Sequence, residues 1–303
     1  MIDGVENKKL RPTADAEWTV TEPCELLSFL LDKLSRQSRN NIKALLTHKQ
    51  VMVNGRVVSQ YNQPLKPGQT VQLILSVDRS KKQKTLLQVI FEDEDFLVID
   101  KPAGLLSIAS DTEKEQTAYH LLTDYVRKAD PKARIFVVHR LDRDTSGVLL
   151  FAKTEKMKLA LQDDWDSLVS NREYTAIVEG TLEEKQGRIQ SWLKETKTHL
   201  SYSSNSPGYG QKAITNYKVL SETKDLSLLQ IQLETGRKNQ IRVHMKELGH
   251  PVVGDRKYGA KLSPLKRLGL HANRLEFTHP FTKAPLRFEA ELPKSFQQIF
   301  RGK

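Results

Sequence analysis

The densest group of reactive side chains in this sequence lies in HRLDRDTSG, residues 139–147. The apolar run 135–138 precedes it and the apolar run 148–152 follows it, which predicts a loop between two strands. Loops that a rigid scaffold positions often carry function. The two carboxylates of this loop, Asp142 and Asp144, are therefore the first candidates for chemistry.

Two kinds of carboxylate site fit this loop poorly. A calcium loop would take oxygen ligands from Asp142, Asp144 and Ser146, with Gly147 at its sixth position. Its twelfth position is Lys153, where such a loop requires a glutamate, and strands instead of helices flank it. A glycosidase needs an acid and a nucleophile at one bond, and two carboxylates two residues apart on an extended loop are not expected to face one bond.

The elements around the loop are predicted from apolar periodicity. After residue 86, short apolar runs alternate with turns, which indicates a strand-rich domain. We expect α+β architecture with a mixed, mainly antiparallel sheet and a central active-site cleft. Residues 183–210 are polar and rich in turn formers, so they predict a mobile excursion over the surface. Helical spacing interrupts the strands three times, at 117–128, 155–169 and 240–248.

A smaller α/β unit is predicted ahead of this domain. Leucines at helical spacing predict a helix over 25–34, and Ser38 is a suitable N-cap for a second helix that runs to Leu46. Asn54-Gly55 predicts a tight hairpin, and Pro67-Gly68 turns the chain into a further strand. The expected boundaries are an arm at 1–19, the small unit at 20–77, a linker at 78–85 and the large domain at 86–303.

The overall charge favours a polyanionic partner. Lys and Arg number 48 against 37 Asp and Glu, which gives a formal net charge of +11 and a pI near 9.5. Bases outnumber acids most clearly over 25–66, although a solvated helix face without a ligand has the same composition. The single cysteine, Cys24, excludes an internal disulfide. No apolar run approaches the roughly 18 residues of a membrane span and no leader is visible, so we expect a cytoplasmic protein.

An ordered set of motifs resembles the RluA family of pseudouridine synthases. HRLDRDTSGVLLFAK is very similar to that family's signature. The other motifs follow in the family's order: KPAGLL at 101–106, REYTAIVEG at 172–180, LETGRKNQIRVHMKELGHPVVGDRKYG at 233–259 and LGLHANRLEFTHP at 268–280. The ordered set is far more specific than HRLD alone. The segment SRNNIKALLTHKQVMVNGRVV, residues 38–58, resembles the second helix and hairpin of the S4 RNA-binding module.

The resemblance implies roles for four residues of the large domain. Asp142 would be the catalytic nucleophile, Tyr174 the tyrosine packed under the target uracil, and Arg242 the arginine that pairs with the aspartate. Arg140 would fill the space that a flipped nucleotide leaves in a duplex. A carboxylate nucleophile must be ionised, and a nearby guanidinium stabilises that form. From the residues alone, Tyr174 also fits a core tyrosine of a strand, and Arg242 also fits a surface base of a helix.

The resemblance also implies the partners. Structured RNA is the expected substrate, with large-subunit ribosomal RNA first and transfer RNA second, and the expected enzyme is a monomer that needs no cofactor and no metal. The alternative is a non-catalytic RNA-binding or assembly protein on the same scaffold. Phosphate contacts are expected from five bases of the small unit, namely Lys33, Arg36, Arg39, Lys43 and Arg56.

Asn239 and four histidines carry separate expectations. Asn239 departs from the family pattern, in which histidine commonly precedes the QIR triplet, and we expect it to alter substrate fit more than activity. The histidines near the motifs have no neighbours that would complete a set of metal ligands. We therefore expect structural hydrogen bonds for each of them: His139, His244, His250 and His271.

Overall fold

The chain consists of two compact units, residues 1–85 and 86–303. The computed structural model describes residues 16–35, 37–47, 50–74, 87–110, 113–196 and 200–300. Each unit has a hydrophobic core of its own. The expected linker at 78–85 lies outside the described residues and stays a prediction.

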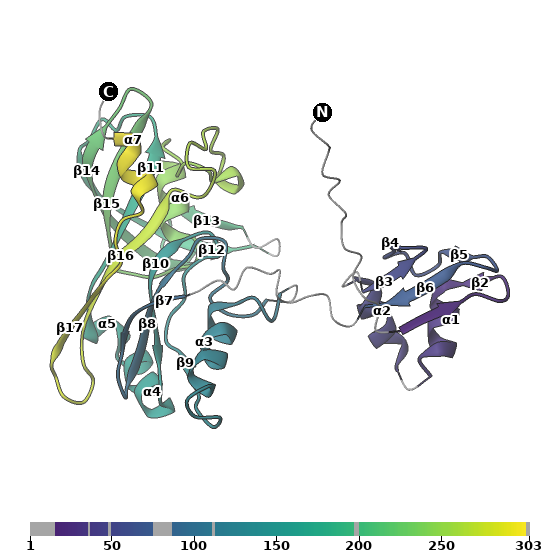
Figure 1. The fold of residues 1–303 in the computed structure, drawn as a ribbon. Helices are drawn as coiled ribbons and strands as arrows, with labels where there is room; N and C mark the ends of the chain where they lie inside the picture. The colour runs from purple at the N-terminus through teal and green to yellow at the C-terminus, as the bar shows by residue number, and fades with distance from the viewer. Residues whose placement is uncertain are drawn as a thin grey trace, which may run out of the picture. The chain divides into compact units, whose positions relative to one another are not determined.

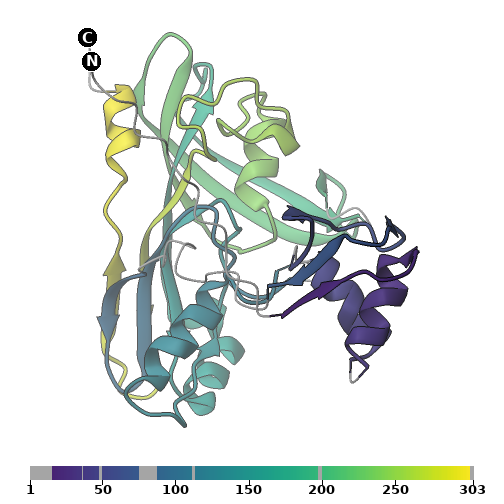
Figure 2. The same cartoon turned by 45° about the vertical axis from the view of Figure 1, so that its right-hand side comes forward.

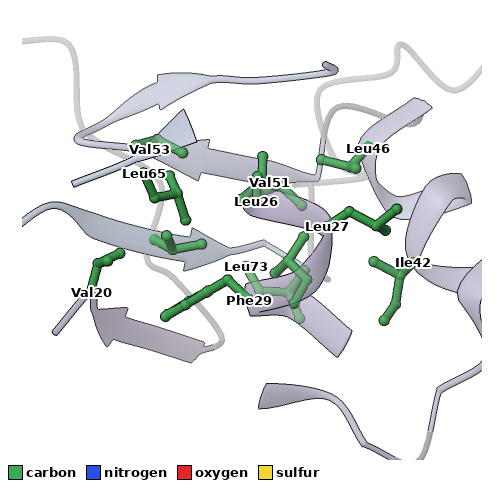
Figure 3. Packing of buried hydrophobic residues seen from close by; sticks show 12 residues of the cluster. Val20, Leu26, Leu27, Phe29, Ile42, Leu46, Val51, Val53, Leu65 and Leu73 are labelled. Atoms are coloured by element: carbon green, nitrogen blue, oxygen red, sulfur yellow. The ribbon is translucent and has the colours of Figure 1, made fainter. Parts of the chain in front are cut away.

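The first unit is a small α/β module (Figure 1). Its helices and strands are β1 (Ala16–Thr19), β2 (Cys24–Glu25), α1 (Leu26–Lys33), α2 (Arg39–Thr47), β3 (Val51–Val53), β4 (Arg56–Val57), β5 (Pro64–Leu65) and β6 (Thr70–Leu73). Four strands form a sheet in the order β1-β6-β3-β4, and β2 pairs with β5. Leu27, Ile42 and Val51 show how the helices and the sheet share one apolar core (Figure 3).

Local chemistry explains most boundaries of this unit. The Ser38 hydroxyl accepts a hydrogen bond from the Asn41 amide at 3.2 Å, which caps α2 as expected. Both residues of the Asn54-Gly55 turn have positive φ, the geometry of a two-residue hairpin. The expected arm was wrong for Ala16–Thr19, which pairs with β6. The physical reason is the alternation of this segment, which turns Trp18 onto the core.

The second unit is built on one large sheet. Its strands are β7 (Gln88–Glu92), β8 (Phe96–Lys101), β9 (Phe136–Val137), β10 (Ser146–Ala152), β11 (Val169–Glu179), β12 (Gln186–Glu195), β13 (Ser201–Ser204), β14 (Gln211–Glu222), β15 (Leu226–Leu233), β16 (Leu270–Thr278) and β17 (Pro285–Glu289). The order is β13-β12-β14-β15-β11-β16-β10-β8-β7, with β9 on β10 and β17 on β16. The pairing of β10 with β16 is parallel and the other pairings between these strands are antiparallel. The expected mixed, mainly antiparallel sheet is confirmed.

Helices cover both faces of this sheet. They are α3 (Ala118–Arg127), α4 (Glu155–Asp163), α5 (Trp165–Leu168), α6 (Gln240–Glu247), the 3-10 helix η2 (Arg256–Tyr258) and α7 (Lys294–Phe300). On β8, Leu97 and Ile99 pack with α3, whereas Phe96 and Val98 pack with α4, because successive side chains of a strand point to opposite faces. Figure 2 shows α6 against the long strands of the other half of the sheet.

Two expectations for this unit were wrong. Residues 183–210 are not an excursion over the surface, because β12 and β13 lie within this range and extend the main sheet. Polar composition concealed a strand in which the buried Ser191 and Leu193 alternate with exposed or partly exposed residues. The single helix expected over 155–169 ends at Asp163, and a separate short turn, α5, follows before β11 begins at Val169.

Candidate active site

Asp142 lies in the loop between β9 and β10, and the backbone on both sides of it is held. The Ser107 hydroxyl accepts a hydrogen bond from the Leu141 amide at 3.1 Å and donates one to the Leu141 carbonyl at 2.7 Å. On the other side, the Arg143 carbonyl accepts a hydrogen bond from the Gly104 amide at 2.9 Å. The Asp142 side chain is 24% exposed. Its carboxylate is therefore fixed in direction and still accessible to a ligand.

A buried lysine completes the support of this loop. Lys101 ends β8 with no exposed surface, and its amine donates to the carbonyls of Pro102, Leu105 and Arg143 at 3.0, 2.7 and 3.0 Å. Three carbonyls match the three donors of an ammonium group. Burial lowers the pKa of Lys101 to about 7, and the carboxylate of Asp144 opposes this shift. The sequence did not identify this role, although a lysine directly after the apolar strand FLVID is a signal for it.

Arg242 lies on α6 between two carboxylates. Its Nη1 donates to Asp142 Oδ2 at 3.1 Å. Its other edge binds both oxygens of Asp255, with Nε–Oδ2 at 2.6 Å and Nη2–Oδ1 at 2.8 Å. The side chains of Arg242 and Asp255 are only 13% and 1% exposed. Burial acts to lower the pKa of Arg242, but Asp255 and Asp142 outweigh it and raise that pKa, so the guanidinium stays charged.

Asn239 and Tyr258 fix the orientation of the same guanidinium. Asn239 Oδ1 accepts a hydrogen bond from Arg242 Nη1 at 2.8 Å, and Asn239 Nδ2 donates to the Tyr258 hydroxyl at 3.1 Å. Arg242 Cζ lies 5.0 Å from the centroid of the Tyr258 ring. Asn239 has a φ of 57°, a left-handed conformation that asparagine adopts more readily than most residues. Asn239 therefore helps to orient Arg242.

Tyr174 of β11 lines the same pocket as Asp142. It packs against two of the hydrophobic clusters of the unit, one on the β8–β10 side and one on the β15–α6 side. Burial raises the pKa of Tyr174 to about 12, and the Arg172 guanidinium opposes this shift. The phenol is therefore protonated at neutral pH, and it offers an aromatic face together with a hydroxyl.

One pocket brings together the predicted residues of the large domain. It is lined by Asp142, Tyr174, Arg242 and Arg140, and its walls include Leu233 and Leu270. Arg140 is exposed. A carboxylate, a cation, an aromatic ring and apolar walls around one opening suit a planar, polar base.

The predicted RNA-binding bases of the first unit that the structure describes lie on its surface. Lys33 pairs with Asp32 at 3.1 Å. Lys43 Nζ lies 5.1 Å from the ring centroid of Tyr61, which is itself 51% exposed. Arg36 lies outside the described residues. The exposed bases among those predicted are Lys33, Arg39, Lys43 and Arg56.

Comparison with known proteins identifies the family. The family model described as RNA pseudouridylate synthase matches residues 95–247, and the S4 domain model matches residues 26–71. A Bacillus subtilis protein, "Uncharacterized RNA pseudouridine synthase YhcT", is 35% identical over 294 residues, which cover 95% of this chain and 93% of the relative. The chain belongs to the RluA family of RNA pseudouridine synthases. It is therefore an isomerase that acts on RNA, and its first unit contains an S4 domain.

Further relatives of this synthase are consistent with that result. "Ribosomal large subunit pseudouridine synthase D" from Zymomonas mobilis is 32% identical over 306 residues, with 93% of this chain and 96% of the relative covered. The solved structure of "Human RNA Pseudouridylate Synthase Domain Containing 4" is 25% identical, with a TM-score of 0.58 and 69% and 90% of the two chains covered. The fold and the family predicted from the motifs are thus confirmed.

The four histidines near the motifs make structural hydrogen bonds, as expected. His244 lies 2.8 Å from the hydroxyls of Ser191 and Thr215, and His271 lies 2.8 Å from the Ser146 hydroxyl. Burial lowers the pKa of both imidazoles to about 4, so they are neutral at pH 7. The other two, His139 and His250, bond the Leu150 amide and the Glu179 carbonyl.

Two kinds of feature are absent from the part of the chain that the structure describes. Within it, no three His, Cys, Asp or Glu side chains are grouped so that they could hold a metal ion. No helix among the described residues is long and apolar enough to cross a membrane. Asp255 and Tyr258, which the sequence indicates only as part of the motif at 233–259, contact Arg242.

Proposed function

We propose that this pocket isomerises a flipped uridine of large-subunit ribosomal RNA, with Asp142 as the nucleophile. The observation that carries the proposal is the contact of Arg242 with Asp142 inside a pocket that Tyr174 also lines. The guanidinium donates a charge-assisted hydrogen bond to Asp142 Oδ2 and so orients the carboxylate within the pocket. A paired uridine cannot reach this carboxylate, so the nucleotide leaves its stack, and Arg140 is the planar side chain that would take its place.

The reaction rearranges bonds without gain or loss of atoms. The N1–C1′ bond of the uridine breaks, the uracil turns, and a C5–C1′ bond forms. C5 then loses its proton and N1 gains one. Asp142 forms a covalent bond either to the sugar at C1′ or to the base at C6, and this bond breaks again when the product forms. The carboxylate is thereby regenerated.

Tyr174 supports this chemistry as a neutral group. Its ring can pack under the uracil while the base turns. Because its pKa is raised to about 12, its hydroxyl is not a ready-made phenolate at neutral pH. Help with the C5 proton would therefore require the hydroxyl to pass on its own proton as it accepts another.

The preferred substrate is supported by relatives and by charge. Relatives about 30% identical carry the name "Ribosomal large subunit pseudouridine synthase D". The S4 domain adds exposed bases that attract phosphates. Transfer RNA is the second candidate, and we propose a monomer that works in the cytoplasm, where ribosomes are assembled.

Pseudouridine mapping of ribosomal and transfer RNA tests the proposal. Three strains are compared with the wild type: one without the protein, one with Asp142→Asn and one with Asp144→Asn. Asp144 is the matched control, because it lies two residues away and its side chain is 44% exposed in an ion pair with Arg143. We expect one or more pseudouridines to vanish in the first two strains and to persist in the third.

The other outcomes separate the alternatives. Asp142→Asn should bind RNA almost as well as the wild type, because the phosphate contacts remain. Turnover by Asp142→Asn would refute the role of this carboxylate. Unchanged uridines in every strain, with RNA binding intact, would favour the non-catalytic RNA-binding protein. Free uracil among the products would indicate a glycosidase.

A further inference from the structure

The end of the sheet formed by β12, β13 and β14 has a face that α6 does not cover. On β12, Ser191 and Leu193 are buried on the α6 side, where Ser191 bonds His244 at 2.8 Å. Because side chains alternate along a strand, Trp192 and Lys194 point to the opposite face. Lys194 is exposed there and Trp192 is partly exposed.

Two tyrosines and two lysines form a continuous row at this end. Tyr202 of β13 is the register partner of Lys194, so their side chains are neighbours on one face. Tyr202 is 43% exposed on the edge strand, and Nζ of Lys246, a residue of α6, lies 5.9 Å from its ring centroid, so the row begins at the α6 side of this edge. Tyr209 is 42% exposed, and Lys194 Nζ lies 5.8 Å from its ring centroid. We call Lys246, Tyr202, Lys194 and Tyr209 the tyrosine–lysine row.

The row is connected to the active-site pocket through the start of β14. Arg237 lines the pocket, and its Nε donates to the Lys212 carbonyl at 3.0 Å. Lys212 is exposed and is the register partner of Trp192. Trp192 in turn precedes Lys194 by two residues on the same strand face. The pocket lies on the α6 side of the sheet and Lys194 on the opposite face, so an RNA strand that leaves the pocket past Arg237 reaches the row by passing around the start of β14.

We propose that the tyrosine–lysine row stacks unpaired nucleotides that flank the target uridine. Aromatic side chains on an open sheet face stack on bases of single-stranded RNA, and lysines between them pair with phosphates. The ammonium groups lie close to the outer limit of a cation–π contact, so little interaction energy with the rings is lost when they turn to a phosphate. The bases of an intact duplex are stacked on one another and offer no face to the row.

The proposal explains how flipping is supported beyond the pocket. When one uridine leaves the stack, its unpaired neighbours lose a stacking partner. Tyr202 and Tyr209 would replace part of that stacking. This inference rests on the proposed function for the position of the RNA, because it places the flipped uridine in the pocket beside Arg237.

Binding of two fluorescein-labelled RNAs tests the row. One is a hairpin with an all-uridine loop, and the other is a continuous duplex with the same stem. With the full chain, Tyr202→Ala and Tyr209→Ala should each raise the Kd for the hairpin roughly tenfold and leave the Kd for the duplex unchanged. Tyr202→Phe and Tyr209→Phe keep the ring and should bind like the wild type. Tyr125→Ala is the control, since Tyr125 is 44% exposed on α3.

The lysine between the two rings provides a second test. Lys194→Gln should lower the salt dependence of hairpin binding by about 0.7 in the slope of log K against log salt. Lys224→Gln should leave that slope unchanged, since Lys224 lies in the exposed turn between β14 and β15, at the other end of β14 from Lys212.

The outcomes also separate this inference from the proposed function. Equal hairpin binding by the wild type and both alanine variants would refute nucleotide binding by the row, even if Asp142 proved essential for turnover. Losses as large in the phenylalanine variants as in the alanine variants would overturn stacking as its mechanism. Weaker hairpin binding by the alanine variants would support the row, even if no uridine were isomerised.

Discussion

The cations of the two units differ in what surrounds them. In the second unit, Lys101 is fully buried among three carbonyls, and Arg242 lies between two carboxylates with 13% of its side chain exposed. In the first unit, Arg39 and Lys43 are exposed on α2. A buried ion has lost its water and must be fully partnered, whereas an exposed one keeps its water and its freedom. The buried cations hold the carbonyls and carboxylates around them in place, and the exposed cations attract phosphates.

Replacing Arg242 should have the largest effect. Arg242→Gln leaves the Asp255 carboxylate buried without a cation and removes the partner of Asp142. We expect kcat to fall by about 10³-fold, which corresponds to about 4 kcal/mol of transition-state stabilisation. Single-turnover assays on the RNA identified by mapping measure this. Arg188→Gln is the control, because Arg188 pairs with Glu234 at the surface and is 49% exposed. An equal fall in kcat in the two variants would contradict the difference between buried and exposed cations.

Lys101→Met should mainly reduce stability. The change removes three hydrogen bonds and leaves buried carbonyls without a donor, so the free energy of unfolding should fall by about 3 kcal/mol. Urea titration measures it. Lys153→Met is the matched control. Lys153 directly follows β10, the strand next to β8, and its ion pair with Glu92 is partly exposed, so this variant should lose less than about 1 kcal/mol. A similar loss of unfolding free energy in the two variants would show that the burial of Lys101 is not the cause of its effect on stability.

The pH dependence of Lys101 has a defined sign. Its pKa is lowered from 10.5 to about 7 in the folded protein, so the folded state binds fewer protons than the unfolded state between these values. The free energy of unfolding should therefore rise with pH from about 7 to 10.5. The stability that this lowered pKa contributes is fully present above pH 10.5 and is lost as the pH falls through 7. The difference between the wild type and Lys101→Met should grow over that range, and a constant difference would refute the shift.

Asp255→Asn should have a smaller effect that is confined to catalysis. Asparagine keeps an oxygen acceptor for Arg242 but removes the buried negative charge. The guanidinium should therefore turn towards Asp142 and restrict the movement of that carboxylate. We expect kcat to fall about 30-fold, about 2 kcal/mol, with the KM for RNA within twofold of the wild type. Asp255 would then be a positioning residue. A rise in KM with an unchanged kcat would instead place it in RNA binding.

The sequence predicted the residues of the pocket better than the contacts that hold them. Asp142, Tyr174 and Arg242 could be read from motif order, and the structure places them in one pocket. Asp255 and Lys101 could not be assigned, because their roles depend on contacts between elements distant in sequence, which periodicity does not reveal. The strands at 186–195 and 201–204 were missed for a related reason. Their polar residues are satisfied by tertiary bonds, such as that of Ser191 with His244, and composition alone indicated a loop.

Replacing a base of the first unit should have the smallest effect. Lys43→Gln removes one exposed charge near Tyr61, and no buried group loses its partner. We expect the KM for RNA to rise only a few-fold at low salt, with kcat unchanged, because phosphate attraction acts on binding and not on the reacting atoms. Lys132→Gln, an exposed base in the turn after α3, is the control and should change neither. If Lys43→Gln lowered kcat instead, this exposed cation would be acting on catalysis, and the division between fixed and free cations would not hold.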